Sequence, residues 1–203
     1  MEMTRESVME AVRKRISRLP RGAPFSTSEF LGVGSRVAVH QALSRLTRAG
    51  KIARLARGIF VKPKRSAVLG NLTVPAVKVV EAAVRSSHSR LQISGAEAAN
   101  RLGLSTQVPG QAVYLTDGPS RVIRFGRQEI VLRHRSPKSL IGIGTEAGQV
   151  IEALRYLGKG HLTVEHIEHL RNSLCTNTKV DLRRFSTQAP LWMERFLRQI
   201  CDA

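Results

Sequence analysis

The sequence predicts an α+β protein of two domains, and three observations lead to this prediction. Apolar residues recur at helical spacing through the first 50 positions, and two short strand-like runs follow them. Residues 111–134 alternate between apolar and polar side chains, as strands do, and helical spacing returns after Thr145. A chain of 203 residues with 42% hydrophobic and 24% charged residues can form two small ordered cores.

The strongest compositional signal is positive charge. The chain holds 33 Lys and Arg against 15 Asp and Glu, a net charge of +18. Residues 1–66 carry 15 of these cations and 4 of the acids, so the N-terminal third is the most basic region. Such an excess opposes compaction unless a polyanion neutralises it, which makes nucleic acid the expected partner. A membrane is disfavoured, because no run of about 18 apolar residues could span a bilayer.

The first two elements are expected to be helices. Val8, Val12, Ile16 and Leu19 share one helical face, and the segment "LPRGAP" ends that helix. Ser26 followed by Glu29 three positions later forms a capping-box pattern, which predicts a short second helix ending near Gly32.

A third helix and a β-hairpin follow. Ser35 is the expected N-cap, Gly50 the expected stop, and one face holds the apolar residues Val39, Ala42, Leu43 and Leu46. The runs "KIARLA" and "GIFVK" predict two strands joined by a turn at Arg57 and Gly58. Helix, helix, tight turn, helix and hairpin is the order of a winged helix-turn-helix, so residues 1–66 are predicted to form a DNA-binding domain of this type.

Residues 34–61 contain no acidic residue and seven basic ones when His40 is counted. Helical geometry places the charge opposite the apolar face, where Arg can bind guanine, Gln adenine, and Val a thymine methyl group. The alternative interpretation is that these basic residues form a solvent-exposed helix surface that binds no partner. The predicted DNA-binding residues are Ser35, Arg36, Val37, His40, Gln41, Ser44, Arg45, Arg48, Arg54 and Arg57. Around the hairpin, phosphate or minor-groove contacts are expected from Lys51, Lys62, Lys64 and Arg65. Duplex DNA is favoured over RNA, because only 4% of residues are aromatic and few could stack on bases.

Residues 67–203 are expected to form a second α+β domain. The segment 62–75 is a predicted connector, and helices are predicted in "PAVKVVEAAVRSS" and "SGAEAANRLG". Alternation broken at "DGPS" and "GR" in residues 111–134 predicts a three-stranded antiparallel meander. Three further helices are predicted in "TEAGQVIEALRYLG", "TVEHIEHLRNSL" and "APLWMERFLRQI".

The chain resembles the AbiEi-type antitoxins of bacterial type IV toxin–antitoxin systems. The resemblance rests on "LTRAGKIARLARGIFVKP", on "SGAEAANRLGLSTQVPGQAVYLTDG" and on "APLWMERFL", and it covers nearly the whole length. It implies a transcriptional autorepressor that binds inverted repeats in its own promoter, and a neighbouring gene for a nucleotidyltransferase-type toxin that the C-terminal part counters. Where those family members carry Tyr in the wing, this chain has Phe60, which lacks the hydroxyl group.

No catalytic, metal or cofactor site is predicted. His169 lies one helical turn after both Glu165 and His166, close enough to share an ion with them. No further ligand motif accompanies these residues, and a polar helix face is the favoured interpretation. Asp117 and Glu129 lack the lysine that a nuclease pattern would place after Glu129, and "GVGSR" and "GIGTEAG" match no phosphate-binding loop. The only cysteines are Cys175 and Cys201. They are read as reduced thiols in the cytoplasm, because the N-terminus lacks an apolar signal core.

The sequence allows two interpretations for each of two further surfaces. The last helix carries an apolar patch of Leu191, Trp192, Met193 and Phe196, which is expected to be core and alternatively binds a toxin. The predicted meander carries arginines that either extend the DNA footprint or face solvent, and these are Arg121, Arg124, Arg127, Arg133 and Arg135. Monomeric and dimeric binding to DNA both remain possible.

Overall fold

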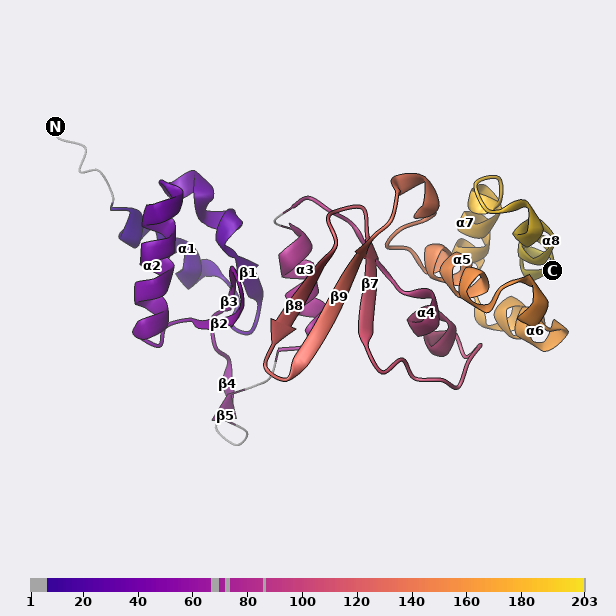
Figure 1. Ribbon diagram of the computed structural model, residues 1–203, viewed down its shortest axis with the longest axis horizontal. Coiled ribbons are helices and arrows are strands. Elements are labelled where there is room, and N and C mark those ends of the chain that lie inside the picture. The colour runs from indigo at the N-terminus through magenta and orange to yellow at the C-terminus, as the bar shows by residue number, and fades with distance from the viewer. Residues whose placement is uncertain (1–6, 67–69, 72–73, 86, 203) are drawn as a thin grey trace. The chain divides into compact units, whose positions relative to one another are not determined.

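The computed structural model describes residues 7–66, 70–71, 74–85 and 87–202, and shows a mixed α+β protein (Figure 1). The chain forms two compact units. The first comprises Met1–Ser89 with Ile123–Glu129, and the second comprises Arg90–Val122 with Ile130–Ala203.

The first unit contains the helices and the hairpin that the sequence predicts. Helix α1 spans Val8–Arg18 and α2 spans Arg36–Arg48, while strands β2 (Ala53–Ala56) and β3 (Ile59–Val61) form the hairpin. The short second helix is present as a 3₁₀ helix, η1 (Thr27–Val33), and its capping box between Ser26 and Glu29 is confirmed. Strand β1 (Pro24–Ser26) completes an antiparallel sheet of order β1-β3-β2. Three residues are too few to show alternation, so sequence reasoning missed this strand.

The core of the first unit is built around three phenylalanines. Phe25 lies with its ring centroid 5.3 Å from that of Phe30 and 6.1 Å from that of Phe60. Phe60 is therefore a core residue, and the other buried side chains around this cluster come from α1, α2 and Ile52. Aromatic packing of this kind holds α1, η1 and α2 against the small sheet.

Helix α3 (Ala76–Arg85) also belongs to the first unit. It packs on β1 and β3, and the Arg85 guanidinium donates a hydrogen bond to the Pro24 carbonyl oxygen at 2.8 Å. The sequence-based boundary after residue 66 would assign α3 to the second domain, whereas the two compact units divide at Ser89.

The predicted connector, residues 62–75, contains a two-stranded antiparallel pair, β4 (Arg65–Ser66) and β5 (Gly70–Asn71). Its remaining positions at 67–69 and 72–73 lie outside the described residues.

The sheet formed by residues 91–134 differs from the predicted antiparallel meander, and that prediction is wrong. The strands β6 (Leu91–Ile93), β7 (Ala112–Thr116), β8 (Arg121–Phe125) and β9 (Gln128–His134) lie in the order β6-β7-β9-β8. Strands β7 and β9 are parallel, from Ala112 opposite Ile130 to Thr116 opposite His134. The alternating pattern identifies strands but not their neighbours, so it does not reveal that β9 lies between β7 and β8.

The second unit adds five helices to this sheet. They are α4 (Gly95–Arg101), α5 (Glu146–Leu157), α6 (Val164–Ser173), α7 (Thr176–Ser186) and α8 (Leu191–Cys201), with short 3₁₀ turns at Pro137–Ser139 and Lys159–His161. Helices α5 to α8 gather beside one another (Figure 1). Helix α7 was not predicted, because its sequence is polar and buries only Thr178 and Leu182.

Two glycines allow close backbone approaches in the second unit. A Cβ atom on Gly95 would lie 2.6 Å from the Glu152 carbonyl oxygen, where α4 meets α5. A Cβ atom on Gly148 would lie only 2.1 Å from the Gly142 carbonyl oxygen, where the preceding loop folds onto α5. The backbone contacts at both positions therefore require the absence of a side chain.

Candidate nucleic-acid interface

Helix α2 is positioned by local capping and by its apolar face. The Ser35 side chain accepts a hydrogen bond from the Ala38 amide at 3.3 Å, which confirms the predicted N-cap. At the other end Gly50 adopts a φ of 65°, and the Lys51 amide donates to the Leu46 carbonyl oxygen at 3.0 Å. The four predicted apolar residues of α2 are buried. One side of the helix is thus anchored in the core.

The opposite side of α2 is open to solvent. The exposed residues of this side are Ser35, Arg36, Val37, His40, Gln41, Ser44, Arg45 and Arg48, and we call them the α2 face. Arg54 in β2 and Arg57 in the following turn are exposed as well. All ten residues proposed from the sequence as DNA contacts therefore have accessible side chains.

The arginines of the α2 face have no side-chain partner in the part of the chain that the structure describes. Among the described residues, no hydrogen bond or ion pair involves the side chains of Arg36, Arg45 or Arg48. No acidic residue occurs between residues 34 and 61 to neutralise them. Their guanidinium groups are free to bind an anion without first breaking an internal contact.

The α2 face also contains a shallow hollow of about 450 Å³. It is lined by Arg36, Val37, His40, Gln41 and Ser44. Val37 is 67% exposed there, although the side chains around it are polar or charged. The hollow therefore combines one apolar contact point with several hydrogen-bonding groups.

The hairpin presents a smaller set of cations. Gly58 has a φ of 74°, which allows the tight turn that exposes Arg57. Arg54 uses its Nε atom in a hydrogen bond of 3.4 Å to the Ala56 carbonyl oxygen, at the irregular position of β2. Lys51 and Lys64 are exposed, and the side chain of Arg65 lies outside the described part of the chain.

Lys62, a predicted phosphate contact, also has a structural role. Its ammonium group donates to the carbonyl oxygens of Ser17 at 2.9 Å and of Leu19 at 3.4 Å. A cation at the carboxyl end of a helix satisfies unpaired carbonyl groups and interacts favourably with the negative end of the helix dipole. Lys62 therefore ties the hairpin to the end of α1, and its contact with a nucleic acid stays a prediction.

Helix α1 carries basic side chains that sequence reasoning did not select. Arg13, Arg15 and Arg18 are exposed, and the Arg15 guanidinium lies 5.5 Å from the centre of the Phe30 ring. The signal in the sequence was the run "RKRISR" on a helix whose opposite face is apolar. These residues add to the positive charge of the first unit.

The arginines of β8 and β9 have mixed environments. Arg124 pairs with Glu129 at 2.7 Å, whereas Arg127, Arg133 and Arg135 are exposed. Their part in a nucleic-acid footprint stays a prediction.

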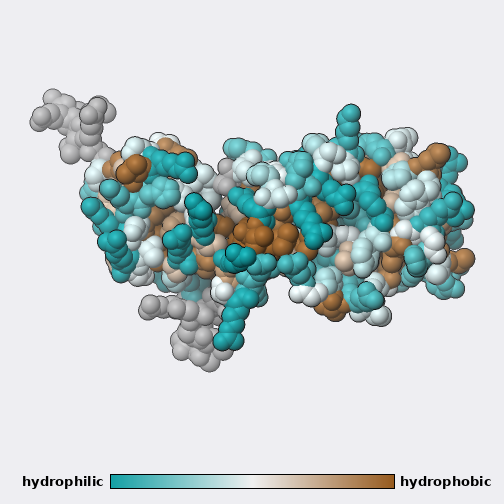
Figure 2. Space-filling model, viewed as in Figure 1, coloured by the Kyte–Doolittle hydropathy of each residue, from teal (hydrophilic) through white to brown (hydrophobic). Residues whose placement is uncertain are grey.

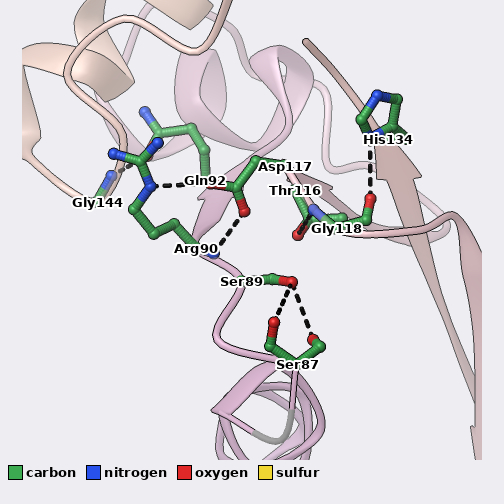
Figure 3. Close-up of polar contacts among 9 residues, drawn as sticks. All are labelled: Ser87, Ser89, Arg90, Gln92, Thr116, Asp117, Gly118, His134 and Gly144. Atoms are coloured by element: carbon green, nitrogen blue, oxygen red, sulfur yellow. Dashed lines mark hydrogen bonds and ion pairs between the residues drawn. The ribbon is translucent and has the colours of Figure 1, made fainter. Parts of the chain in front are cut away.

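Asp117 and Glu129, the carboxylates weighed as catalytic candidates, are both engaged in structural contacts. Asp117 accepts hydrogen bonds from the Arg90 amide at 2.7 Å and from Arg90 Nε at 2.9 Å (Figure 3). The hydrogen bond from the Arg90 amide lowers the pKa of Asp117, and the hydrogen bond and charge of the Arg90 guanidinium group lower it further. The adjacent turn is held by a hydrogen bond of 3.1 Å from the Gly118 amide to the Thr116 hydroxyl group (Figure 3). These contacts explain Asp117 as a turn residue.

The histidines of α6 are used in local hydrogen bonds. His166 Nδ1 accepts from the Thr163 amide at 3.3 Å, which forms a capping box, and His169 Nε2 lies 3.0 Å from the Leu102 carbonyl oxygen. Within residues 7–66, 70–71, 74–85 and 87–202, no three His, Cys, Asp or Glu side chains cluster as metal ligands would.

The two cysteines lie in different surroundings. Cys175 is exposed, and a hydrogen bond with the Thr178 hydroxyl group lowers the pKa of its thiol. Cys201 is buried, and burial raises the pKa of its thiol. Both are free thiols.

The apolar patch of α8 divides into two parts. Met193 and Phe196 are buried, which confirms them as core. Leu191 is 85% exposed and Trp192 is half-buried. A hollow of about 400 Å³ is lined by Leu191, Trp192, Glu194, Arg195, Arg198 and Lys159.

Comparison with known proteins identifies the family of this chain. Residues 11–182 match the model of a family described as "Family of unknown function (DUF6088)". The chain belongs to the DUF6088 family. No curated protein and no solved structure matches this DUF6088 chain. Among its described residues, no helix has the length and apolar character needed to cross a membrane.

Proposed function

We propose that this DUF6088 protein is a sequence-specific double-stranded DNA-binding protein that represses transcription. The observation that carries the proposal is the α2 face. There Arg36, Arg45 and Arg48 are exposed, and none of them pairs with another described residue. Gln41 and other hydrogen-bonding side chains lie beside them. A polyanion that enters such a face gains charge-assisted hydrogen bonds without displacing internal ones.

The first unit serves as a winged helix-turn-helix in this proposal. Its elements follow in the order α1, β1, η1, α2, β2 and β3, so three helices precede a hairpin. The core anchors only one side of α2. An α-helix fits the major groove of B-DNA, where Arg and Gln side chains can bind guanine and adenine edges. Arg57, in the tight turn between β2 and β3, is then a wing residue that contacts the phosphate backbone.

The proposal includes an antitoxin role, which rests on the resemblance to AbiEi-type antitoxins. A repressor of this kind acts in the cytoplasm on inverted repeats in its own promoter. Its C-terminal unit counters a nucleotidyltransferase-type toxin encoded by the neighbouring gene. Sequencing the flanking gene tests this part of the proposal, and an unrelated neighbour would argue against it.

A salt-titrated gel shift on duplexes from the DNA upstream of the gene tests DNA binding. Arg45→Ala and Gln41→Ala should each weaken specific binding by about 1–3 kcal/mol and leave binding to random duplexes nearly unchanged. Arg57→Ala should weaken both kinds of binding and reduce the salt dependence. Arg184→Ala, at an exposed arginine of α7, is the matched control. Equal losses on specific and random duplexes for the α2 variants would contradict base readout.

A second candidate function is a protein-interaction module, and the hollow beside α8 favours it. An 85% exposed leucine next to a half-buried tryptophan is an apolar surface that a partner protein could cover. Co-expression with the product of the adjacent gene tests this candidate. Co-purification that is lost in Trp192→Ala supports it, and separate elution of the two intact proteins opposes it.

A further inference from the structure

Val37 is the exception on the α2 face. The other members of the face are polar or charged, while Val37 is a β-branched apolar residue with 67% of its surface exposed. Neither core packing nor helix propensity explains a valine at this position. Its side chain is not buried in the core, and valine is a weaker helix former than the long polar residues.

Hydrogen-bonding side chains surround Val37 on the α2 face. His40, Gln41 and Ser44 follow at three, four and seven positions, so they lie on the same side of the helix and line the same hollow as Val37. Gln41 supplies both a donor and an acceptor, whereas Ser44 is small and leaves space. The hollow thus offers an apolar contact point with hydrogen-bonding groups within one helical turn.

We propose that Val37 recognises thymine by contacting its C5-methyl group in the major groove. This inference rests on the proposed function, because it requires α2 to enter the groove of a DNA duplex. The methyl group is the only apolar feature that the four base pairs of unmodified DNA present there, so an exposed valine distinguishes thymine from cytosine at its position.

The spacing on α2 also limits the site around that thymine. Gln41 lies one helical turn beyond Val37, a rise of about 6 Å at 1.5 Å per residue. Successive base pairs are about 3.4 Å apart. The adenine that Gln41 can bind therefore lies within about two base-pair steps of the thymine that Val37 contacts.

The experiment begins with selection of binding duplexes from a random-sequence library by the full chain. Each thymine of the selected site is then replaced by deoxyuridine, one position at a time, which removes only the methyl group. Fluorescence anisotropy measures the Kd of the wild-type chain and of Val37→Ala. Val180→Ala is the matched control, because Val180 is a 54% exposed valine on α7.

Replacement of thymine by deoxyuridine should lower the wild-type affinity about fourfold at one position of the site, as expected for the loss of one methyl contact. Val37→Ala should bind the thymine duplex about as weakly as the wild type binds the uracil duplex, and should show no further loss with uracil. Val180→Ala should behave as the wild type. Because Val37 is exposed and alanine favours helix, the variant should keep the wild-type melting temperature.

Two results overturn the inference and can be told apart from failure of DNA binding. The first is a wild-type chain that binds a selected site but is insensitive to every thymine-to-uracil change. The second is uracil sensitivity that Val37→Ala retains in full. A chain that selects no duplex from the library contradicts the proposed function itself, and the thymine inference with it.

Discussion

Several arginines of the C-terminal helices are used in a different way from the arginines of α2. The guanidinium groups of Arg36, Arg45 and Arg48 on the α2 face make no internal hydrogen bond or ion pair among the described residues. In the second unit, Arg155 donates to the Ser139 carbonyl oxygen at 2.9 Å and pairs with Glu152, and Arg171 donates to the Gln199 carbonyl oxygen at 2.9 Å. Arg183 donates to the carbonyl oxygen of Cys201 at the end of α8.

This difference shows that net charge is a poor guide to where a polyanion binds. Both halves of the sequence are basic, yet many cations of the second unit are already committed to the fold. The surface map of Figure 2 shows hydrophilic side chains over much of the visible face, so hydrophilicity alone does not separate the two classes. The bonding state of each arginine does, because a cation with internal partners must break them before it can bind a phosphate.

The largest expected effect concerns the packing of the second unit. Gly148→Ala places a Cβ atom 2.1 Å from a backbone oxygen that cannot move independently, so we expect a loss of about 3 kcal/mol in the free energy of unfolding. Urea denaturation followed by circular dichroism measures the loss. Gly110→Ala is the control, because no atom lies within 4 Å of the added Cβ, and it should change little. Equal stability of the two variants would contradict the close approach at Gly148.

The next prediction tests the comparison of arginines directly. Arg171→Met removes a hydrogen bond to α8 and should cost about 1.5 kcal/mol of stability without changing duplex binding. Arg45→Met removes no internal bond and should change stability by less than about 0.5 kcal/mol while it weakens duplex binding. Thermal melts and gel shifts on both variants provide the measurements. Reversed effects would show that the division between structural and binding arginines is mistaken.

Ser35 allows capping and DNA binding to be separated at one position. Ser35→Ala removes the N-cap bond to the Ala38 amide and should cost about 1 kcal/mol of stability. Ser35→Asp should retain the cap and the stability, since a carboxylate also favours a helix N-terminus. The added negative charge should nevertheless lower duplex affinity. Denaturation and anisotropy titrations check the two effects, and full duplex affinity in Ser35→Asp would place Ser35 away from the DNA.

The smallest effect is a pH dependence in the second unit. Burial raises the pKa of Glu152, and the charges of Arg155 and Arg135 offset only part of that rise. The folded chain therefore takes up a proton at a pH where the unfolded chain does not, so this contribution to stability is present at low pH and lost as the pH rises. Wild type should therefore gain stability relative to Glu152→Gln as the pH falls from neutral toward the ordinary pKa of a glutamate. Urea denaturation at several pH values measures the difference, and a constant or shrinking difference would contradict the raised pKa.

Features that depend on neighbouring residues in the chain were predictable. The N-cap at Ser35, the capping box at Ser26 and the turn at Gly58 follow from local hydrogen bonding and backbone freedom. The division of α2 into a buried and an exposed side follows from helical periodicity. The residues of the candidate interface were therefore identifiable before the structure.

Features that depend on distant partners were not predictable. Lys62 looks like any other basic residue near the hairpin, and only the structure shows its ammonium group on the carbonyl oxygens at the end of α1. Strand β9 lies between β7 and β8 although the alternating pattern suggested a simple meander. Helix α7 escaped notice because few of its residues face the core.

The amino-acid sequence by itself determined helices α1, η1 and α2 and the β2–β3 hairpin, the capping of α2 and the concentration of positive charge on one side of that helix, because each depends on residues within a few positions of one another. The tertiary structure alone decided which cations stay available, which strands are neighbours and where glycine is required. Those properties depend on groups that folding brings together from distant positions, and local periodicity contains no record of such contacts.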